Sequence, residues 1–316
     1  METYTKINTL YKRYAFDAKN CPKKDWLKFR NKIILGEFSN KEAEYLFHCH
    51  WEAYSKLDGT NSKIAFFPST SEIRVEGKTE KAESQHGQFE LLREIGERIK
   101  PQLCQMFPKE SARFAPVKGD NNKIQYYDVH ADFNEYDEKT MTAIMQAKFD
   151  KKDTIISNGM YGVELEEVPI YIYGEYFGEG IQKCGKRYIT KGNSFAVFDI
   201  KQQGWWTPKD VRDSICKELG LETVPFIGVM TLADIEDMVR KGFATKFAAA
   251  DPTLIEEGIV ARPTIPLFDG SNKRIIVKVK YCDYIEYDSV RKEFSDEEFA
   301  EFDKWYHENA ETLYQK

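Results

Sequence analysis

Three absences narrow the setting in which this chain works. The sequence has no run of about 18 apolar residues, which excludes a membrane-spanning helix, and its polar N-terminus carries no apolar signal segment. Its six cysteines are scattered without a Cys-x-x-Cys pair, which argues against a disulfide framework and against a zinc ribbon. We therefore expect a protein of a reducing, cytoplasmic compartment.

An excess of positive charge is also missing, because the formal net charge is -6. This excludes a histone-like polycation, although it leaves room for a local basic channel. The acid is concentrated at the C-terminus, where residues 281–316 contain 11 Asp/Glu and only 4 Lys/Arg. Aromatic residues are abundant, with 18 Tyr and 21 Phe, which indicates a ring-rich core or a stacking surface.

The 316 residues, 41% of them hydrophobic, can form one large domain or two smaller ones. Short apolar or alternating segments predict strands at residues 56–67, 170–176, 195–200, 258–262 and 274–281. Between the first two, apolar residues at spacings of three and four predict a helix from His86 to Leu103, which Pro101 should end or kink.

Capping signals predict three more helices. A threonine-proline start at Thr207 and a glycine stop at Gly220 bound the first of them, and residues 231–240 repeat this design. A capping box at residues 295–298 begins the last helix. Strands at both ends of the chain with helices between them indicate an α+β domain built on antiparallel sheets.

We expect three parts along the chain. Residues 1–50 form a polar lead-in packed on the core, residues 51–286 form the main domain, and residues 287–316 form an acidic C-terminal helix. Residues 108–160 are polar and contain the turn signal Gly119-Asp120-Asn121-Asn122, so we interpret them as an insertion or small subdomain within the main domain.

The segment Tyr54-Ser55-Lys56-Leu57-Asp58-Gly59-Thr60-Asn61 carries the first candidate for chemistry. A lysine amine becomes a nucleophile when burial or neighbouring cations lower its pKa, and glycine lets a backbone approach a ligand closely. Alone, Lys-x-Asp-Gly also fits a surface turn that follows a solvated lysine. Its meaning therefore depends on the rest of the sequence.

Four later segments supply matching features. Glu175 lies on a strand just before a glycine-rich turn, and Phe198 lies on the next strand. The pair Glu256-Glu257 stands at the start of a short strand, where alternation fixes only that the two side chains point in opposite directions. Lys278 and Lys280 are spaced by two, so they share one face of a strand whose apolar residues face a core.

In this order, the segments resemble nucleotidyltransferase motifs I, III, IIIa, IV and V of the covalent ligase and capping-enzyme superfamily, over roughly residues 51–286. The stretches at residues 174–182 and 257–260 resemble the RNA ligase branch, which includes the bacteriophage double-strand RNA ligases and the trypanosome editing ligases. The resemblance implies an α+β, ATP-grasp-like nucleotidyltransferase domain. It would have two antiparallel sheets with flanking helices, a nucleotide groove between them, the insertion, and a short C-terminal helical tail.

The resemblance also implies a role for each candidate. Lys56 would attack the α-phosphate of ATP to form a lysyl-AMP intermediate. Lys278 and Lys280 would lie at that phosphate and would help to depress the pKa of Lys56. Asp58 would help to organise the lysine and the metal. Glu257 would offer a hard oxygen ligand to Mg²⁺ or Mn²⁺.

Further positions would hold the nucleotide. Glu175 would bind the ribose hydroxyls, and Phe198 would stack on the purine, with Phe195 as the alternative. The basic residue that the family places after motif I falls on Lys78 or on Arg74, and the sequence leaves that choice open. The cofactor-binding positions beside the candidate nucleophile are Ser55, Leu57, Gly59 and Asn61.

The implied function is an ATP-dependent RNA ligase that transfers AMP to a 5′-phosphate end and seals that end to a 3′-hydroxyl in RNA repair. Only 36 residues follow Lys280, which leaves no room for the OB domain of DNA ligases and capping enzymes. A protein partner would then replace a larger C-terminal domain. A viral source would place the reaction in the host cytoplasm.

Three alternatives stay open on the sequence. Two belong to the same superfamily, namely a DNA ligase and an mRNA-capping guanylyltransferase. The third is a non-catalytic nucleic-acid-binding protein that uses a decayed domain, against which the intact Lys56, Lys278 and Lys280 argue. The sequence does not specify whether the substrate is a nick, a single-strand break, a tRNA end or an RNA–DNA hybrid.

Overall fold

The computed structural model divides the chain into two compact units, each assembled from segments that are distant in the sequence. The first unit consists of Met1–Thr60, Glu175–Ala196 and Thr223–Lys316, and the second consists of Asn61–Gly174 and Val197–Glu222. The described residues are 4–68, 70–77, 87–108, 111–118, 124–128, 154–157, 160–164, 169–182, 188–189, 191–202, 204–247 and 253–313.

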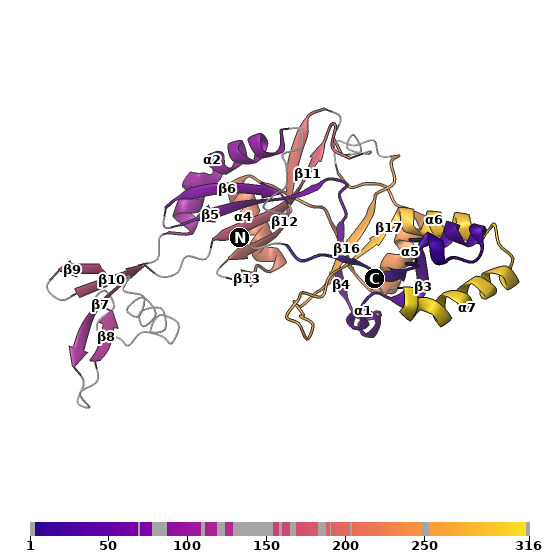
Figure 1. Cartoon of the computed structure of the whole chain (residues 1–316). Coiled ribbons are helices and arrows are strands. Elements are labelled where there is room, and N and C mark those ends of the chain that lie inside the picture. The colour runs from indigo at the N-terminus through magenta and orange to yellow at the C-terminus, as the bar shows by residue number, and fades with distance from the viewer. Residues whose placement is uncertain are drawn as a thin grey trace. The chain divides into compact units, whose positions relative to one another are not determined.

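The first unit is built on a five-stranded sheet (Figure 1). In spatial order, its strands are β1 (Asn8–Thr9), β17 (Val277–Lys280), β16 (Gly258–Pro263), β4 (Trp51–Ser55) and β15 (Phe226–Met230). Neighbouring strands run antiparallel except β1 and β17, which run parallel and pair Thr9 with Lys278. Segments from both ends of the chain therefore meet in one sheet.

One face of this sheet is apolar, as the alternation of its strands predicted. Val277 and Val279 of β17 and Ile259 of β16 are buried in one hydrophobic cluster. Helices α5 (Leu232–Lys241) and α6 (Tyr281–Arg291) contact β17 and contribute to the same cluster. The opposite face of the sheet is polar, and it carries the candidate site.

A second cluster joins the two ends of the chain. It is formed by β2 (Tyr11–Arg13), η1 (Ala18–Asn20), η2 (Lys24–Phe29) and β3 (Ile33–Phe38) with their connections, packed against α7 (Asp296–Leu313) (Figure 1). Its buried side chains, which we call the aromatic clasp, are Tyr14, Phe16, Trp26, Phe29, Ile34, Phe302 and Tyr306. The clasp thus packs the N-terminal lead-in onto the C-terminal helix.

Three ion pairs link the N-terminal lead-in to the chain between the start of α6 and α7. With their Nζ–Oε distances, these pairs are Lys23–Glu301 at 2.6 Å, Lys28–Glu293 at 2.8 Å and Lys32–Glu286 at 2.7 Å. The predicted capping box is present, because the Ser295 and Glu298 side chains and backbone amides bond reciprocally. The acidic C-terminal segment is therefore paired in part with lysines of the N-terminal lead-in.

The second unit contains most of a six-stranded sheet. Its strands are β13 (Trp205–Trp206), β12 (Asn193–Gln202), β11 (Ile170–Gly178), β5 (Thr60–Phe67) and β6 (Glu72–Gly77) in spatial order, with β14 (Glu222–Thr223) paired to β12. Helix α2 (Gln88–Met106) packs on β6, where Gly96 lets the two approach: a Cβ there would lie 2.6 Å from Cγ2 of Ile73. Helix α4 (Lys209–Leu219) contacts α2.

A separate four-stranded antiparallel sheet also belongs to the second unit. Its strands are β8 (Ile124–Asp128), β7 (Ser111–Lys118), β10 (Met160–Glu164) and β9 (Thr154–Ser157). These strands overlap residues 108–160, which we predicted to be an insertion. The domain boundaries themselves stay a prediction.

Two helix boundaries differ from those predicted. Helix α2 continues through Pro101 to Met106 instead of ending there. Pro101 is exposed, so water can satisfy the backbone carbonyl that a proline leaves without its helical partner. Helix α4 begins at Lys209 with Pro208 as its N-cap, so Thr207 does not cap it. The predicted N-cap at Thr231, which forms a capping box with Asp234, and the glycine stop at Gly220 are both confirmed.

Two strand predictions were wrong at their ends. Lys56 does not lie on a strand, because β4 ends at Ser55 and β5 begins at Thr60. The last predicted strand is shorter, since β17 covers only Val277–Lys280 and α6 begins at once. The sequence prediction also missed α6, the short helix α1 (Lys41–Tyr45) and the strands of the lead-in.

In the part of the chain that the structure describes, no helix is both long and apolar enough to cross a membrane. The five cysteines in that part are free thiols.

Candidate functional site

The site centres on Lys56, in the turn between β4 and β5. Its backbone amide donates to the carbonyl of Gly258 at 2.9 Å, which ties the turn to β16. Its ammonium donates to Oε2 of Glu257 at 2.6 Å, and more weakly to the carbonyl of Leu57 at 3.4 Å. Lys56 and Glu257, which the sequence analysis took from two distant motifs, are thus in direct contact.

Glu257 connects two lysines. Its Oε2 contacts Nζ of Lys56, while its Oε1 contacts Nζ of Lys280 at 2.9 Å. The side chains are 12% exposed for Glu257, 19% for Lys56 and 27% for Lys280, so the three charges are shielded from water only in part. We call these three residues the bridged-lysine network.

The neighbouring Glu256 is fully buried and so is not the solvent-exposed member of the pair. Strand alternation alone did not decide which of the two glutamates reaches Lys56, and the structure shows that it is Glu257. Gly258, which follows them, pairs with Lys280 so closely that a Cβ there would lie 2.0 Å from the carbonyl oxygen of Val279. Glycine at this position brings β16 and β17 together beside Glu257.

Lys278 and Lys280 lie on the polar face of the sheet, as their spacing predicted. Val260 of β16 pairs with Lys278 on one side and with Tyr54 of β4 on the other, so these three side chains share that face. Burial alone would lower the pKa of Lys280, but the adjacent Glu257 carboxylate outweighs burial and raises that pKa.

Glu175 and Gly59 approach each other closely. A Cβ on Gly59 would lie 2.8 Å from Cγ of Glu175 and 2.3 Å from the carbonyl oxygen of Tyr176, so only glycine fits. Burial raises the pKa of Glu175 from 4.5 to about 7, and the charges of Glu257 and Asp58 act in the same direction. Lys56 and the Gly59 amide oppose this rise.

The sequence prediction missed Tyr188, which supports the Lys56 turn. Its hydroxyl accepts from the backbone amide of Asp58 at 2.9 Å and donates to the carbonyl of Lys56 at 3.5 Å. The ring is buried against Phe177 and Phe247. A tyrosine in a basic loop gives no signal in the sequence for such a contact.

A second polar cluster on the same sheet face was also missed. Nε of Arg262 donates to Glu52 at 3.0 Å, and its Nη2 donates to the hydroxyl of Tyr54 at 2.8 Å. The guanidinium also lies over the Tyr54 ring, 4.7 Å from its centroid. Glu52 and Arg262 are cross-strand partners, so pairing of β4 with β16 creates this cluster.

The remaining candidates beside Lys56 differ in burial. Ser55 and Leu57 are buried, and within the described residues no hydrogen-bond partner is found for Oγ of Ser55. Asn61 begins the second unit and is half-buried on β5. Their predicted roles in binding a cofactor stay predictions.

Candidates in the second unit occupy their own sheet. Arg74 on β6 bonds both carboxylate oxygens of Glu72, at 2.7 and 2.8 Å, and lies over the ring of Phe67. Phe198 on β12 is half-buried, and its carbonyl accepts from Nη1 of the buried Arg212 at 2.9 Å. Lys78, the alternative to Arg74, lies outside the described residues.

Phe195, the alternative to Phe198 for stacking on a purine, is buried at 3% exposure. Phe198, which is half-buried on the same strand, is therefore the more accessible of the two.

Glu257 fits a divalent cation chemically. Carboxylate oxygen is the ligand that Mg²⁺ and Mn²⁺ prefer, and both Glu257 oxygens already face positive charge. Glu175 and Asp58 add acidic charge to the surroundings. Among the described residues, no three His, Cys, Asp or Glu side chains form a ready-made metal cage. A cation would therefore depend on phosphate oxygens as further ligands.

Comparison with known proteins adds a family. A model of the RNA ligase family matches residues 50–280, which is more than half of this chain. Among solved structures, the Naegleria gruberi RNA ligase with PPi is similar at 16% identity and a TM-score of 0.41, over 78% of this chain and 54% of that one. A lysine-to-alanine variant of that ligase with ATP and Mn is similar at 14% identity and a TM-score of 0.42, over 79% and 55%.

This chain therefore spans about half the length of the ligases it matches. A search of curated proteins found no match.

Proposed function

The chain belongs to the RNA ligase family, and from this premise we propose that it is an ATP-dependent RNA ligase that works through a lysyl-AMP intermediate on Lys56. The bridged-lysine network is the observation that carries the proposal. Lys56, Glu257 and Lys280 come from three separate segments. The amines of both lysines lie within 2.9 Å of an oxygen of the Glu257 carboxylate. The chemistry of adenylylation needs such a meeting of a nucleophile with groups that neutralise phosphate charge.

In the first step, the deprotonated Nζ of Lys56 attacks the α-phosphorus of ATP. A P–N bond forms, the bond from that phosphorus to the bridging oxygen breaks, and pyrophosphate leaves with the electron pair. Glu257 holds Nζ at 2.6 Å before the reaction and so restricts where the amine lies. Lys278 and Lys280 then stabilise the negative charge that develops on the phosphoryl oxygens.

Glu257 has a second role in this proposal, as a ligand for Mg²⁺ or Mn²⁺. A divalent cation, when bound, supplies further neutralisation of the phosphate charge. If Glu257 turns toward the cation, its hold on Lys56 ends and the amine is released for attack. Two variants of the Naegleria gruberi RNA ligase were solved with ATP and Mn.

The other candidates hold the nucleotide. Glu175 accepts from the ribose hydroxyls, and Phe198 stacks on the purine. Arg74 or Lys78 reaches a terminal phosphate, where lysine would lack the bidentate fork of arginine. Asp58 organises the Lys56 turn, whose backbone Tyr188 already holds.

Two further steps complete ligation. The AMP passes from Lys56 to the 5′-phosphate of an RNA strand, and a 3′-hydroxyl then attacks that activated phosphate and releases AMP. By the same family resemblance, we place this reaction in RNA repair, in the cytoplasm of a virus-infected host. We also propose that a protein partner takes part in binding the RNA.

The test uses the full chain with labelled nucleotide and Mg²⁺, followed by denaturing electrophoresis. We expect covalent label from ATP and none from GTP. Label from GTP alone would instead identify a capping guanylyltransferase. Addition of a 5′-phosphorylated strand, nicked or single-stranded and made of RNA or DNA, should then remove the label only when that strand is RNA.

A non-catalytic nucleic-acid-binding protein is the alternative from another class. It predicts RNA binding without covalent label from any nucleotide. The same electrophoresis therefore decides between a ligase and a binding protein.

A further inference from the structure

The strand that carries Lys278 and Lys280 is fixed from outside the motifs, by the N-terminal lead-in. Strand β17 is only four residues long and ends at Lys280, which is also the N-cap residue of α6. On its outer edge, β1 pairs Thr9 with Lys278, and the amide of Leu10 donates to the carbonyl of Lys278 at 3.0 Å. The lead-in is therefore hydrogen-bonded to the lysine strand itself.

Just beyond β17, Asp283 lies in the first turn of α6. An aspartate at this position commonly caps its helix, but no side-chain cap is formed at the N-terminus of α6. Its carboxylate instead accepts from Nη2 of Arg13 at 2.6 Å. The Asp283 side chain is only 8% exposed, so its charge is largely removed from water.

Arg13 is held from two directions. Its Nη2 donates to Asp283, while its Nη1 donates to the carbonyl of Asn31 at 2.7 Å. Arg13 belongs to β2, which pairs with β3 and follows the β1 segment that is bonded to β17. The guanidinium is therefore a fixed partner of the carboxylate and not a mobile surface charge.

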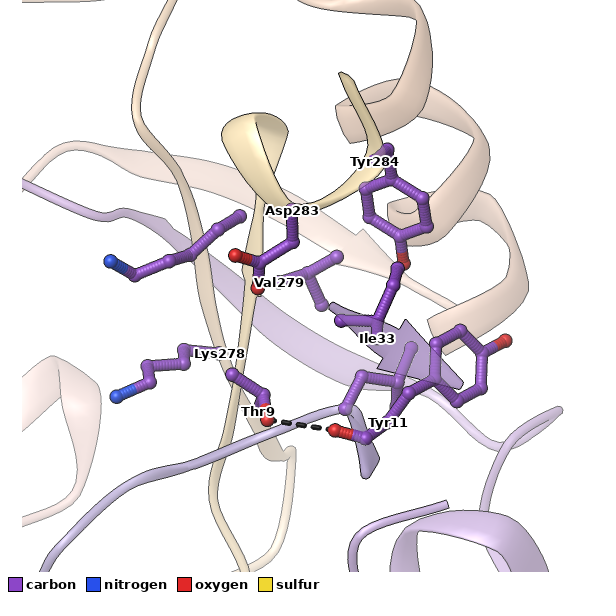
Figure 2. Close-up of a pocket in the computed structure, with 9 residues that line it drawn as sticks. Thr9, Tyr11, Ile33, Lys278, Val279, Asp283 and Tyr284 are labelled. Carbon is purple, nitrogen blue, oxygen red and sulfur yellow. Dashed lines mark hydrogen bonds between the residues drawn. The ribbon is translucent and has the colours of Figure 1, made fainter. Parts of the chain in front are cut away.

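Asp283 also shares a pocket with the two lysines. A small pocket is lined by Lys278, Lys280 and Asp283, together with Thr9 and other residues of the lead-in. Figure 2 shows the Lys278 amine and the Asp283 carboxylate extending toward the same side of this pocket, away from Ile33 and Tyr284. Without a partner of its own, a carboxylate in this place would attract the lysine ammonium groups.

We propose that Arg13 is a positioning residue for adenylylation, which occupies Asp283 and so keeps Lys278 and Lys280 directed toward nucleotide phosphate. The effect of Arg13 on adenylylation rests on the proposed function, whereas its effect on the binding of ATP does not. Any ligand with a polyphosphate would depend on the same two lysines. Arg13 acts through Asp283, and it does not contact the phosphate.

Two measurements test the proposal: the single-turnover rate of covalent labelling by ATP, and the affinity for ATP measured by calorimetry in chains that also carry Lys56→Ala. Arg13→Ala should slow labelling and weaken ATP binding by about tenfold or more, because the Asp283 carboxylate, left without its arginine, competes for the lysines. Arg13→Lys should recover part of both losses, since it restores a positive charge without the fork.

The decisive variant is Arg13→Ala combined with Asp283→Asn. It removes the competing carboxylate along with its partner, and we expect both the rate and the affinity to return close to those of Asp283→Asn alone. Lys32→Ala is the matched control, because it breaks another ion pair between the lead-in and α6, Lys32–Glu286 at 2.7 Å. It should leave both measurements almost unchanged.

Two outcomes would overturn the inference. If the double variant stays as impaired as Arg13→Ala, Arg13 is a structural tether and nothing more. If Arg13→Ala leaves the labelling rate and the ATP affinity as little changed as Lys32→Ala does, Arg13 does not position the lysines. A wild-type chain that binds ATP but takes no label would refute the proposed function, whereas the calorimetric series would still decide the role of Arg13.

Discussion

The bridged-lysine network and the aromatic clasp both join distant segments of the first unit, but they do so by opposite physical means. In the network, one carboxylate with 12% exposure serves two lysines. In the clasp, buried rings pack together, and the ion pairs that link the lead-in to the C-terminal segment, such as Lys23–Glu301 with 51% and 57% exposure, lie in water. Partly buried ion pairs contribute little to net stability, but a bound ligand can change their contacts. Buried aromatic rings stabilise the fold, and a ligand does not change their contacts.

This contrast predicts that variants of the clasp will change stability and that variants of the network will change chemistry. The acidic C-terminal segment takes part in the same contrast. Several of its carboxylates already pair with lysines of the lead-in.

The largest effect is expected in the clasp. Phe302 is fully buried and stacks on Phe29 with ring centroids 4.5 Å apart. Phe302→Ala should lower the free energy of unfolding by about 3–5 kcal/mol, because it removes a large ring and leaves a cavity. Urea unfolding measures this loss. A loss below about 0.5 kcal/mol, the size expected for a surface site, would show that the clasp does not stabilise the unit.

The next effect is on catalysis. Lys280→Ala or Lys278→Ala should slow covalent labelling by ATP about 10²-fold, the usual cost of removing one group that stabilises developing phosphate charge. Lys273→Ala is the matched control, since Lys273 lies exposed in the turn before the same strand. Single-turnover labelling measures the rates. Near-normal rates for both strand variants would make the strand structural.

A third effect depends on pH and tests Glu175, a buried carboxyl group beside the bridged-lysine network. The pKa of Glu175 is raised from 4.5 to about 7, so the folded protein holds this proton more tightly than the unfolded chain. The resulting stability is present at low pH and is lost as pH rises from about 4.5 to about 7. Without nucleotide or metal, Glu175→Gln should therefore gain about 1–3 kcal/mol relative to wild type between pH 5 and pH 8.

Unfolding free energies of both chains at the two pH values measure this change. Glu301→Gln serves as the control, because the Glu301 carboxylate is exposed on α7. If the difference between wild type and Glu175→Gln is the same at both pH values, Glu175 is an ordinary carboxylate.

The smallest effect is expected for the exposed pairs. Glu301→Gln keeps the shape of the side chain and removes the pair with Lys23 at 2.6 Å. It should cost less than about 1 kcal/mol in unfolding free energy, and high salt should reduce even that, because exposed pairs are weak and screened. A cost as large as that of Phe302→Ala would reverse the comparison.

The sequence predicted the parts of the site that follow from periodicity and from ordered motifs. Alternation placed Lys278 and Lys280 on one face and the intervening valine in the core, and the structure agrees. Capping signals placed the starts of α5 and α7 correctly. These features are local, so they can be read from neighbouring residues.

Contacts between distant segments could not be predicted in the same way. Tyr188 reaches the Lys56 turn, and Arg13 reaches Asp283, across separations of more than one hundred residues. Neither residue belongs to a repeating pattern, and β1 and β2 of the lead-in are too short to show alternation. The choice of Glu257 over Glu256 as the partner of Lys56 also required the paired strands.

The central claim is that Lys56 carries the nucleotide, and one measurement tests it most directly. The full chain is incubated with ATP and Mg²⁺, digested, and the peptide that bears AMP is sequenced by mass spectrometry, with Lys63→Ala and Lys56→Ala chains in parallel. We expect AMP on Lys56 in the wild type and in Lys63→Ala, and no covalent AMP in Lys56→Ala. Adenylylated protein from Lys56→Ala, or AMP mapped to another residue, would contradict the account.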